Sequence, residues 1–72
     1  MYSTLKAEIA RSGRTQKELA ELADMTETSL SLKINGKRDF RYKEMRKIRG
    51  AVAPNMTIDE LFFLDYENEN SN

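Results

Sequence analysis

Residues 15–38 read TQKELAELADMTETSLSLKINGKR. Two signals for the start of a helix lie in this stretch. Thr15 and Glu18 have the spacing of a capping box, and Thr26 can accept a hydrogen bond from the turn that follows it. Asn35-Gly36 is a typical helix end. We therefore predict two short helices, one starting at Gln16 and one after Thr26, joined by a turn of about three residues.

Three more helices are predicted outside this stretch. The first covers residues 4–12, with Ser3 or Thr4 as its cap and Gly13 as its stop. The fourth carries an apolar stripe that Pro54 ends, made of Tyr42, Met45, Ile48 and Val52. The fifth is short and opens with a second capping box, Thr57 to Glu60.

No segment alternates convincingly between apolar and polar residues, so the predicted fold class is all-α. The side chains at helical spacing form the predicted core: Leu5, Ile9, Leu19, Leu22, Met25, Leu30, Ile34, Tyr42, Met45 and Ile48. Four large apolar residues near the end exceed what one short helix buries: Phe62, Phe63, Leu64 and Tyr66. Two interpretations stay open, a dimer patch or a wrap of Phe62 and Leu64 onto the core.

The composition excludes several classes of function. A chain of 72 residues has material for one small domain. It contains no Cys and no His, so disulfides, thiol nucleophiles and the commonest zinc ligands are excluded. We expect no enzyme, no metal, no cofactor and no small-molecule ligand. Because no long apolar run or signal pattern is present, we also expect no membrane partner and a cytoplasmic location.

The zero net charge conceals a segregation of charge along the chain. All twelve lysines and arginines lie within residues 1–49 with seven acidic residues, which gives +5, whereas residues 50–72 carry −5. Residues 33–49 alone carry +6. A positive segment of this kind suits a polyanionic partner, and a solvated helix face is the alternative.

The third predicted helix can be oriented from its own sequence. At about 100° per residue, Leu30 and Ile34 share one face, and Thr28 and Leu32 point away from it. Eight residues span about 12 Å, which is about the width of the DNA major groove. Thr28 and Ser31 could hydrogen-bond base edges there and Leu32 could pack on thymine methyl groups. A contact with a partner subunit is the alternative for Leu32.

Residues 16–36, followed by Lys37-Arg38, resemble the helix-turn-helix of the phage Cro/CI repressor group, the XRE-type family. Gln16 stands at the first motif position, Ala20 at the fifth, Met25 at the tenth and Leu30 at the fifteenth. The ninth position departs from the family: it holds Asp24 in place of the usual Gly. Asp is among the few other residues that tolerate a left-handed turn, so we expect the turn to be retained.

The resemblance implies a compact five-helix, lambda-repressor-like DNA-binding domain over residues 1–64, with the helix-turn-helix at 16–36. Residues 65–72 would form an acidic, flexible tail. The candidate base-contacting residues are Glu27, Thr28, Ser31 and Leu32. The candidate phosphate-contacting residues are Gln16, Lys17, Thr26, Asn35, Lys37, Arg38 and Arg41. The role of Glu27 stays open: it could accept from a cytosine amino group, or it could only complement the helix dipole or hold a nearby Lys.

These features predict a sequence-specific transcriptional regulator of phage or prophage type that binds a double-stranded DNA operator. Its third helix would read the major groove, and the chain would be a homodimer at least on DNA. The alternative is a protein-interaction module of the same shape, such as an antitoxin or a phage accessory protein. Zero net charge and an exposed Leu32 favour this alternative.

Overall fold

Five α-helices make up the regular structure of residues 1–65, the part of the chain that the computed structural model describes. They are α1 (Ser3–Ser12), α2 (Gln16–Leu22), α3 (Glu27–Ile34), α4 (Tyr42–Val52) and α5 (Ile58–Leu61). No strand occurs in this part of the chain. The predicted all-α class and the predicted number of helices are therefore confirmed.

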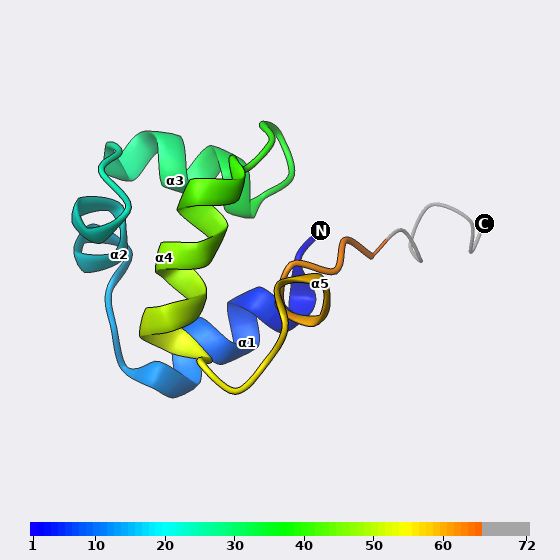
Figure 1. Ribbon diagram of the computed structural model, residues 1–72. Coiled ribbons are helices and arrows are strands. Elements are labelled where there is room, and N and C mark those ends of the chain that lie inside the picture. Colours follow the sequence, from blue (N-terminus) through cyan, green and yellow to red (C-terminus); the bar gives the residue numbers. More distant parts are fainter. Residues whose placement is uncertain (66–72) are drawn as a thin grey trace.

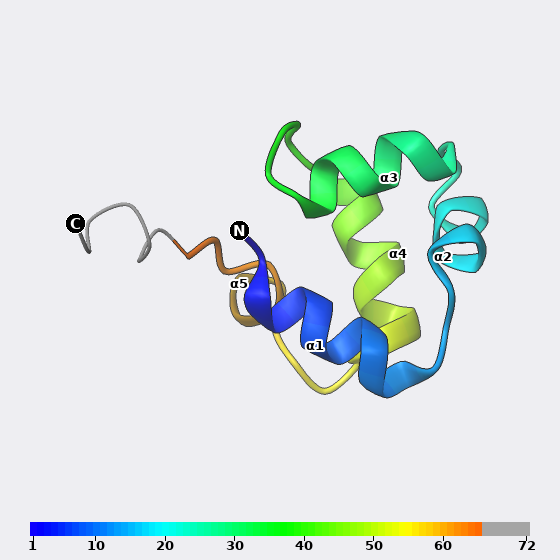
Figure 2. The ribbon, with the colours of Figure 1, turned by 180° about the vertical axis from the view of Figure 1, so that it is seen from behind.

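Helix α4 occupies the middle of the fold, with α3 drawn across one end of it and α1 across the other (Figures 1 and 2). α1 packs against α4 and α5, while α2 packs against α3 and α4. α5 also packs against α4. The two helices of the 15–38 stretch thus lie against each other and leave one side of α3 away from the rest of the chain.

Three of the helices begin with the capping interactions that the sequence predicts. The Thr15 Oγ1 accepts from the Glu18 N–H at 3.1 Å, and the Glu18 carboxylate accepts from the Thr15 N–H at 2.9 Å. The same reciprocal bonds join Thr57 and Glu60 at 3.1 Å and 3.0 Å. The Thr26 Oγ1 accepts from the N–H of Ser29 at 3.1 Å. These local bonds fix where α2, α3 and α5 start.

The predicted cap of α1 is wrong. Ser3 is the first residue of α1 and Tyr2 is its N-cap residue, which makes no capping bond with its side chain. The Ser3 hydroxyl instead donates to the carboxylate of Asp65. The residue at the N-cap position of α1 is therefore a buried aromatic residue rather than a polar cap.

The turn between α2 and α3 keeps a left-handed residue at Asp24, as predicted. Asp24 has φ +64°. Its N–H donates to the carbonyl of Glu21 at 3.1 Å, and the N–H of Met25 donates to the carbonyl of Ala20 at 2.9 Å. These two bonds form a Schellman motif, in which the left-handed position is most often glycine. The turn therefore forms without glycine, at a conformational cost.

We expect Asp24→Gly to stabilise the fold by about 0.5 kcal/mol. Glycine removes about 1–2 kcal/mol of left-handed strain, and the greater freedom of the unfolded chain offsets part of that gain. Urea unfolding of both chains measures the difference. Asp39→Gly is the matched control, because Asp39 has no positive φ and should lose stability when replaced. Equal losses in the two variants would contradict the strain argument.

The core joins aliphatic residues from every helix to a cluster of three aromatic rings. The fully buried side chains are Leu5, Leu19, Leu30, Ile48 and Leu61. Tyr2, Phe40 and Phe62 pack edge to face. The ring centroids lie 5.5 Å apart for Tyr2 and Phe40, 6.1 Å apart for Tyr2 and Phe62, and 4.9 Å apart for Phe40 and Phe62. Such pairs contribute about 0.5–1.5 kcal/mol each beyond the area they bury. The rings tie the start of the chain, the α3–α4 loop and the end of α5 together.

Two predicted core residues are exposed. Leu22 is 42% exposed, because Leu19, Ala20 and Ala23 form the buried stripe of α2 and Leu22 lies about 110° from its centre. Tyr42 is 65% exposed. Tyr42 is the first residue of α4. Because the apolar residues of α4 follow one another at 3, 3 and 4 positions, Tyr42 points in a different direction from the buried Ile48 and Val52. Phe40 occupies the core near this end of α4 instead.

The beginning and the end of the described chain are joined. The Asp65 N–H donates to the carbonyl of Met1 at 2.8 Å, and the Met1 ammonium donates to the carbonyl of Asp65 at 3.0 Å. Of the expected acidic tail, only Asp65 is described, and residues 66–72 lie outside the described residues. Within residues 1–65, no helix has the length and apolar character needed to cross a membrane.

Candidate nucleic-acid interface

Helix α3 presents a polar face opposite its buried side. Leu30 and Ile34 are buried, as predicted, and Glu27 and Thr28 are exposed. Ser31 is partly buried. The side chains predicted to read bases therefore follow one face of α3, with a carboxylate and a hydroxyl group near its beginning.

Leu32 differs from its prediction, because it is partly buried rather than exposed. After Ile34 the chain reverses at Gly36, which has φ +79°. The Lys37 N–H then donates to the carbonyl of Leu32 at 2.9 Å. This bond brings the following loop against the last turn of α3 beside Leu32. Part of the Leu32 side chain remains accessible.

Two candidate phosphate-contacting residues lie at the start of α2. Gln16 and Lys17 are exposed and occupy its first turn. The capping box uses the N–H of Glu18 and the N–H of Thr15. The long side chains of this turn extend from the positive end of the helix, a position that favours an anion.

The residues just after α3 supply cations at its other end. Lys37 is exposed and forms no ion pair within residues 1–65. The Asn35 Nδ2 donates to the carbonyl of Ser31 at 2.9 Å, so one of its two amide hydrogens closes the helix. Asn35 was predicted as a phosphate donor, and one amide hydrogen remains for that role.

A polar groove runs between α3 and the first turn of α4. Three of the predicted residues line it, namely Thr26, Arg38 and Arg41. The groove is completed by Asp24, Met25, Ser29, Lys33, Asp39 and Glu44. The Arg38 Nη1 donates to the Ser29 Oγ at 3.4 Å, which draws this guanidinium back along α3. The predicted residues outside the groove are Gln16, Lys17, Glu27, Thr28, Ser31, Leu32, Asn35 and Lys37.

An ion pair inside this groove was not predicted. Lys33 Nζ donates to both carboxylate oxygens of Glu44, at 2.8 Å and 2.9 Å, and the two side chains are only 12% and 13% exposed. The Arg41 N–H donates to the same carboxylate at 2.9 Å. Burial raises the pKa of Glu44, but the Arg41 N–H and Lys33 outweigh it and hold that pKa below 4.5. Lys33 and Glu44 lie eleven residues apart, so no local pattern marks them.

The +6 segment does not form one continuous surface. Arg49 donates to the carbonyls of Pro54 and Met56, at 3.0 Å and 3.3 Å. The Arg46 guanidinium lies 5.9 Å from the ring centre of Tyr42. Lys43, Lys47 and Arg41 line a small hollow beside the α2–α3 turn. The cations that lie beside α3 include Lys33, Arg38 and Arg41, which line its groove, and Lys37, whose N–H donates to the carbonyl of Leu32.

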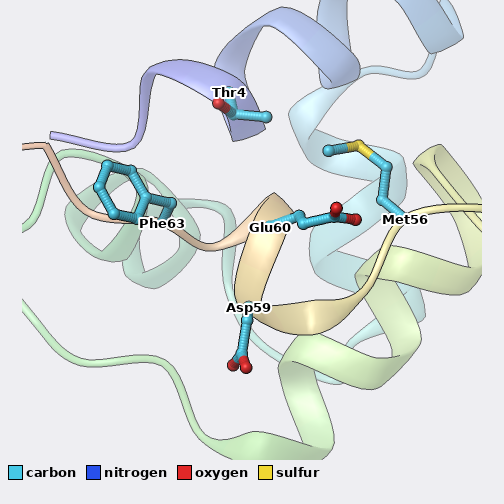
Figure 3. Close-up of a pocket in the computed structure, with 5 residues that line it drawn as sticks. All are labelled: Thr4, Met56, Asp59, Glu60 and Phe63. Atoms are coloured by element: carbon cyan, nitrogen blue, oxygen red, sulfur yellow. The ribbon is translucent and has the colours of Figure 1, made fainter.

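A separate hollow lies between the start of α1 and α5 (Figure 3). It is lined by Thr4, Met56, Asp59, Glu60 and Phe63. Met56 and Phe63 stand at opposite sides of the hollow with Glu60 between them, and the Asp59 carboxylate points away (Figure 3). Phe62 and Leu64 pack onto the core, whereas Phe63 is 62% exposed. Tyr66 lies outside the described residues.

The acidic residues of the described part of the chain, residues 1–65, do not assemble into a metal centre. Within the described part of the chain, no group of three or more carboxylates gathers where it could hold a metal ion. No protein-family model, curated protein or solved structure matches the chain.

Proposed function

We propose that this protein is a sequence-specific DNA-binding transcriptional regulator, in which α2 and α3 act as a helix-turn-helix. The observation that carries the proposal is the exposed face of α3, flanked by the first turn of α2 and by the cations after α3. Glu27 and Thr28 head that face. Gln16 and Lys17 are exposed in the first turn of α2, and Lys37 and Arg38 are exposed just after the end of α3.

This arrangement suits the major groove of DNA. A helix of eight residues is about 12 Å long and fits a groove about 12 Å wide. Phosphate contacts from both flanks would supply most of the affinity and set the register of α3. Thr28, Ser31 and the accessible part of Leu32 would then discriminate among base pairs.

Selection of binders from a random duplex DNA library at moderate salt tests the proposal. A dimer should enrich a near-palindrome whose half-sites are about 10 base pairs apart, centre to centre. The enriched duplex should bind less tightly as salt rises, with a straight line on logarithmic axes. Failure of the folded chain to enrich any sequence would reject the proposal.

A second copy of the chain is the expected partner on DNA, and we place the contact at the Figure 3 hollow. Phe63 would fill the hollow of the partner, where Met56 supplies apolar surface. We expect Phe63→Ser to weaken self-association on the order of tenfold or more, because it removes a large apolar anchor. Sedimentation equilibrium, with and without the selected duplex, measures this. Leu22→Ser is the control, because it also replaces an exposed apolar side chain by serine but lies on α2, away from the hollow. It should leave self-association unchanged, and an equal loss of self-association in this variant would reject the proposed contact.

A protein-interaction module is the second candidate function. The exposed aromatic side chains of Tyr42 and Phe63 favour it, but Leu32, which suggested it in the sequence, is partly buried. Salt dependence separates the two candidates. A DNA complex weakens steeply with salt, whereas an apolar protein contact does not.

A further inference from the structure

The ion pair between α3 and α4 engages a cation of the groove that also holds two of the candidate phosphate-contacting residues, Arg38 and Arg41. Lys33 lines the same groove as Arg38 and Arg41, next to the hydroxyl groups of Thr26 and Ser29. Neither Arg38 nor Arg41 forms an ion pair within residues 1–65, whereas both oxygens of the Glu44 carboxylate engage Lys33. One groove therefore holds two cations that have no ion-pair partner within residues 1–65 and one that is neutralised.

Glu44 is fixed in place by more than its charge. Its carboxylate also accepts the backbone N–H of Arg41, at the beginning of α4. The side chain thus joins three parts of the molecule, namely the last turn of α3, the loop residue Arg41 and the first turn of α4. At 13% exposure it has little freedom to swing away and release Lys33.

We propose that Glu44 restrains sequence-independent DNA binding by keeping Lys33 away from the phosphate backbone. This inference rests on the proposed function of the same surface. A phosphate contact from Lys33 would add affinity for every sequence equally, because phosphates carry no base information. With Lys33 withheld, the phosphate contacts on this side of α3 fall to Arg38, Arg41 and Lys37, all of which are exposed.

Glu44→Gln in the full chain tests the restraint. Glutamine keeps an oxygen for the Arg41 N–H but loses the charge that holds Lys33. The probe is a fluorescent duplex of arbitrary sequence, about 20 base pairs long, titrated from about 0.05 M to 0.2 M salt. We expect the logarithmic salt slope to steepen by about 0.9, with affinity rising on the order of tenfold at about 0.1 M salt.

Two further variants separate the release of Lys33 from a general change in charge. Lys33→Met with Glu44→Gln keeps the net charge of the wild-type chain, and its salt slope should equal that of the wild type. Replacing a buried ion pair by neutral groups often preserves folding, so this double variant also covers the case in which Glu44→Gln unfolds. Asp39→Asn adds the same charge in the same groove without releasing a lysine, and its slope should change by less than half as much.

Specific outcomes would overturn the inference. A wild-type slope in folded Glu44→Gln would show that Lys33 is not withheld. If the salt slope of the double variant is as steep as that of Glu44→Gln, the effect is a general effect of charge. If its salt slope is shallower than that of the wild type by about 0.9, Lys33 already contacts phosphate in the wild type. If the wild-type chain binds no duplex at all, the proposed function and this inference fall together. If it binds but the variants behave otherwise than expected, only the inference fails.

Discussion

Replacing Thr28 and Leu32 together by Ala is expected to lower the preference for the selected operator over other DNA on the order of 100-fold. Each base pair that a protein reads contributes about 1–3 kcal/mol of discrimination, and Thr28 is exposed while Leu32 is partly accessible. Affinity for non-operator DNA should stay nearly constant, because phosphate contacts supply it. Competition binding with the operator and a scrambled duplex measures the ratio.

Lys37→Ala is the matched contrast for this experiment. Lys37 is exposed and is expected to touch phosphate only, so its loss should weaken binding to both duplexes alike and reduce the salt slope by about 0.9. Because Leu32 is partly buried, circular dichroism must confirm the fold of the double variant. Thr28→Ala alone should then lower the preference on the order of tenfold. An unchanged preference in both variants would reject the orientation of α3 on DNA.

The parts of the fold that short-range signals control could be predicted from the sequence. A capping box needs only a Thr and a Glu three residues apart, and both examples form here. The left-handed residue at Asp24 could be expected because the stretch resembles a motif with Gly at this position and because Asp tolerates that conformation. Such bonds lie within one turn of the chain, so they are independent of how the helices pack.

The core depends on contacts between residues far apart in the sequence, which no local pattern indicates. Tyr2, Phe40 and Phe62 come from three distant segments and share no periodicity, yet they form one cluster. Periodicity also overestimates burial at helix ends: Leu22 closes α2 and Tyr42 opens α4, and both are exposed. An apolar stripe predicts which direction is buried only while a neighbouring helix continues beside it.

The candidate interface also has features that could be predicted from the sequence and features that could not. The buried face of α3 could be predicted, because Leu30 and Ile34 are four residues apart on one helix. The partial burial of Leu32 could not, since it depends on the path of the loop after Gly36. The pairing of Lys33 with Glu44 requires the positions of two helices, so the net charge of residues 33–49 overstates the cations available to a partner.

Leu30→Ala is expected to destabilise the fold by about 3 kcal/mol. Leu30 is fully buried, and deletion of a buried leucine side chain loses transfer free energy and leaves a cavity, together about 2–5 kcal/mol. For a domain of this size that loss lowers the melting temperature by roughly 12–24 °C. Thermal unfolding followed by circular dichroism measures it, and the same variant should lose operator binding at temperatures where α3 no longer packs.

Leu22→Ala is the matched control, since it removes the same atoms from a helix next to α3. Leu22 is 42% exposed, so its replacement should change stability by no more than about 0.5 kcal/mol. The helical periodicity of the sequence predicts the opposite for Leu22, namely that its side chain belongs to the core. A loss at Leu22 as large as that at Leu30 would favour the periodicity over the packing of α2 described above. It would also mean that α2 turns a different face toward α3.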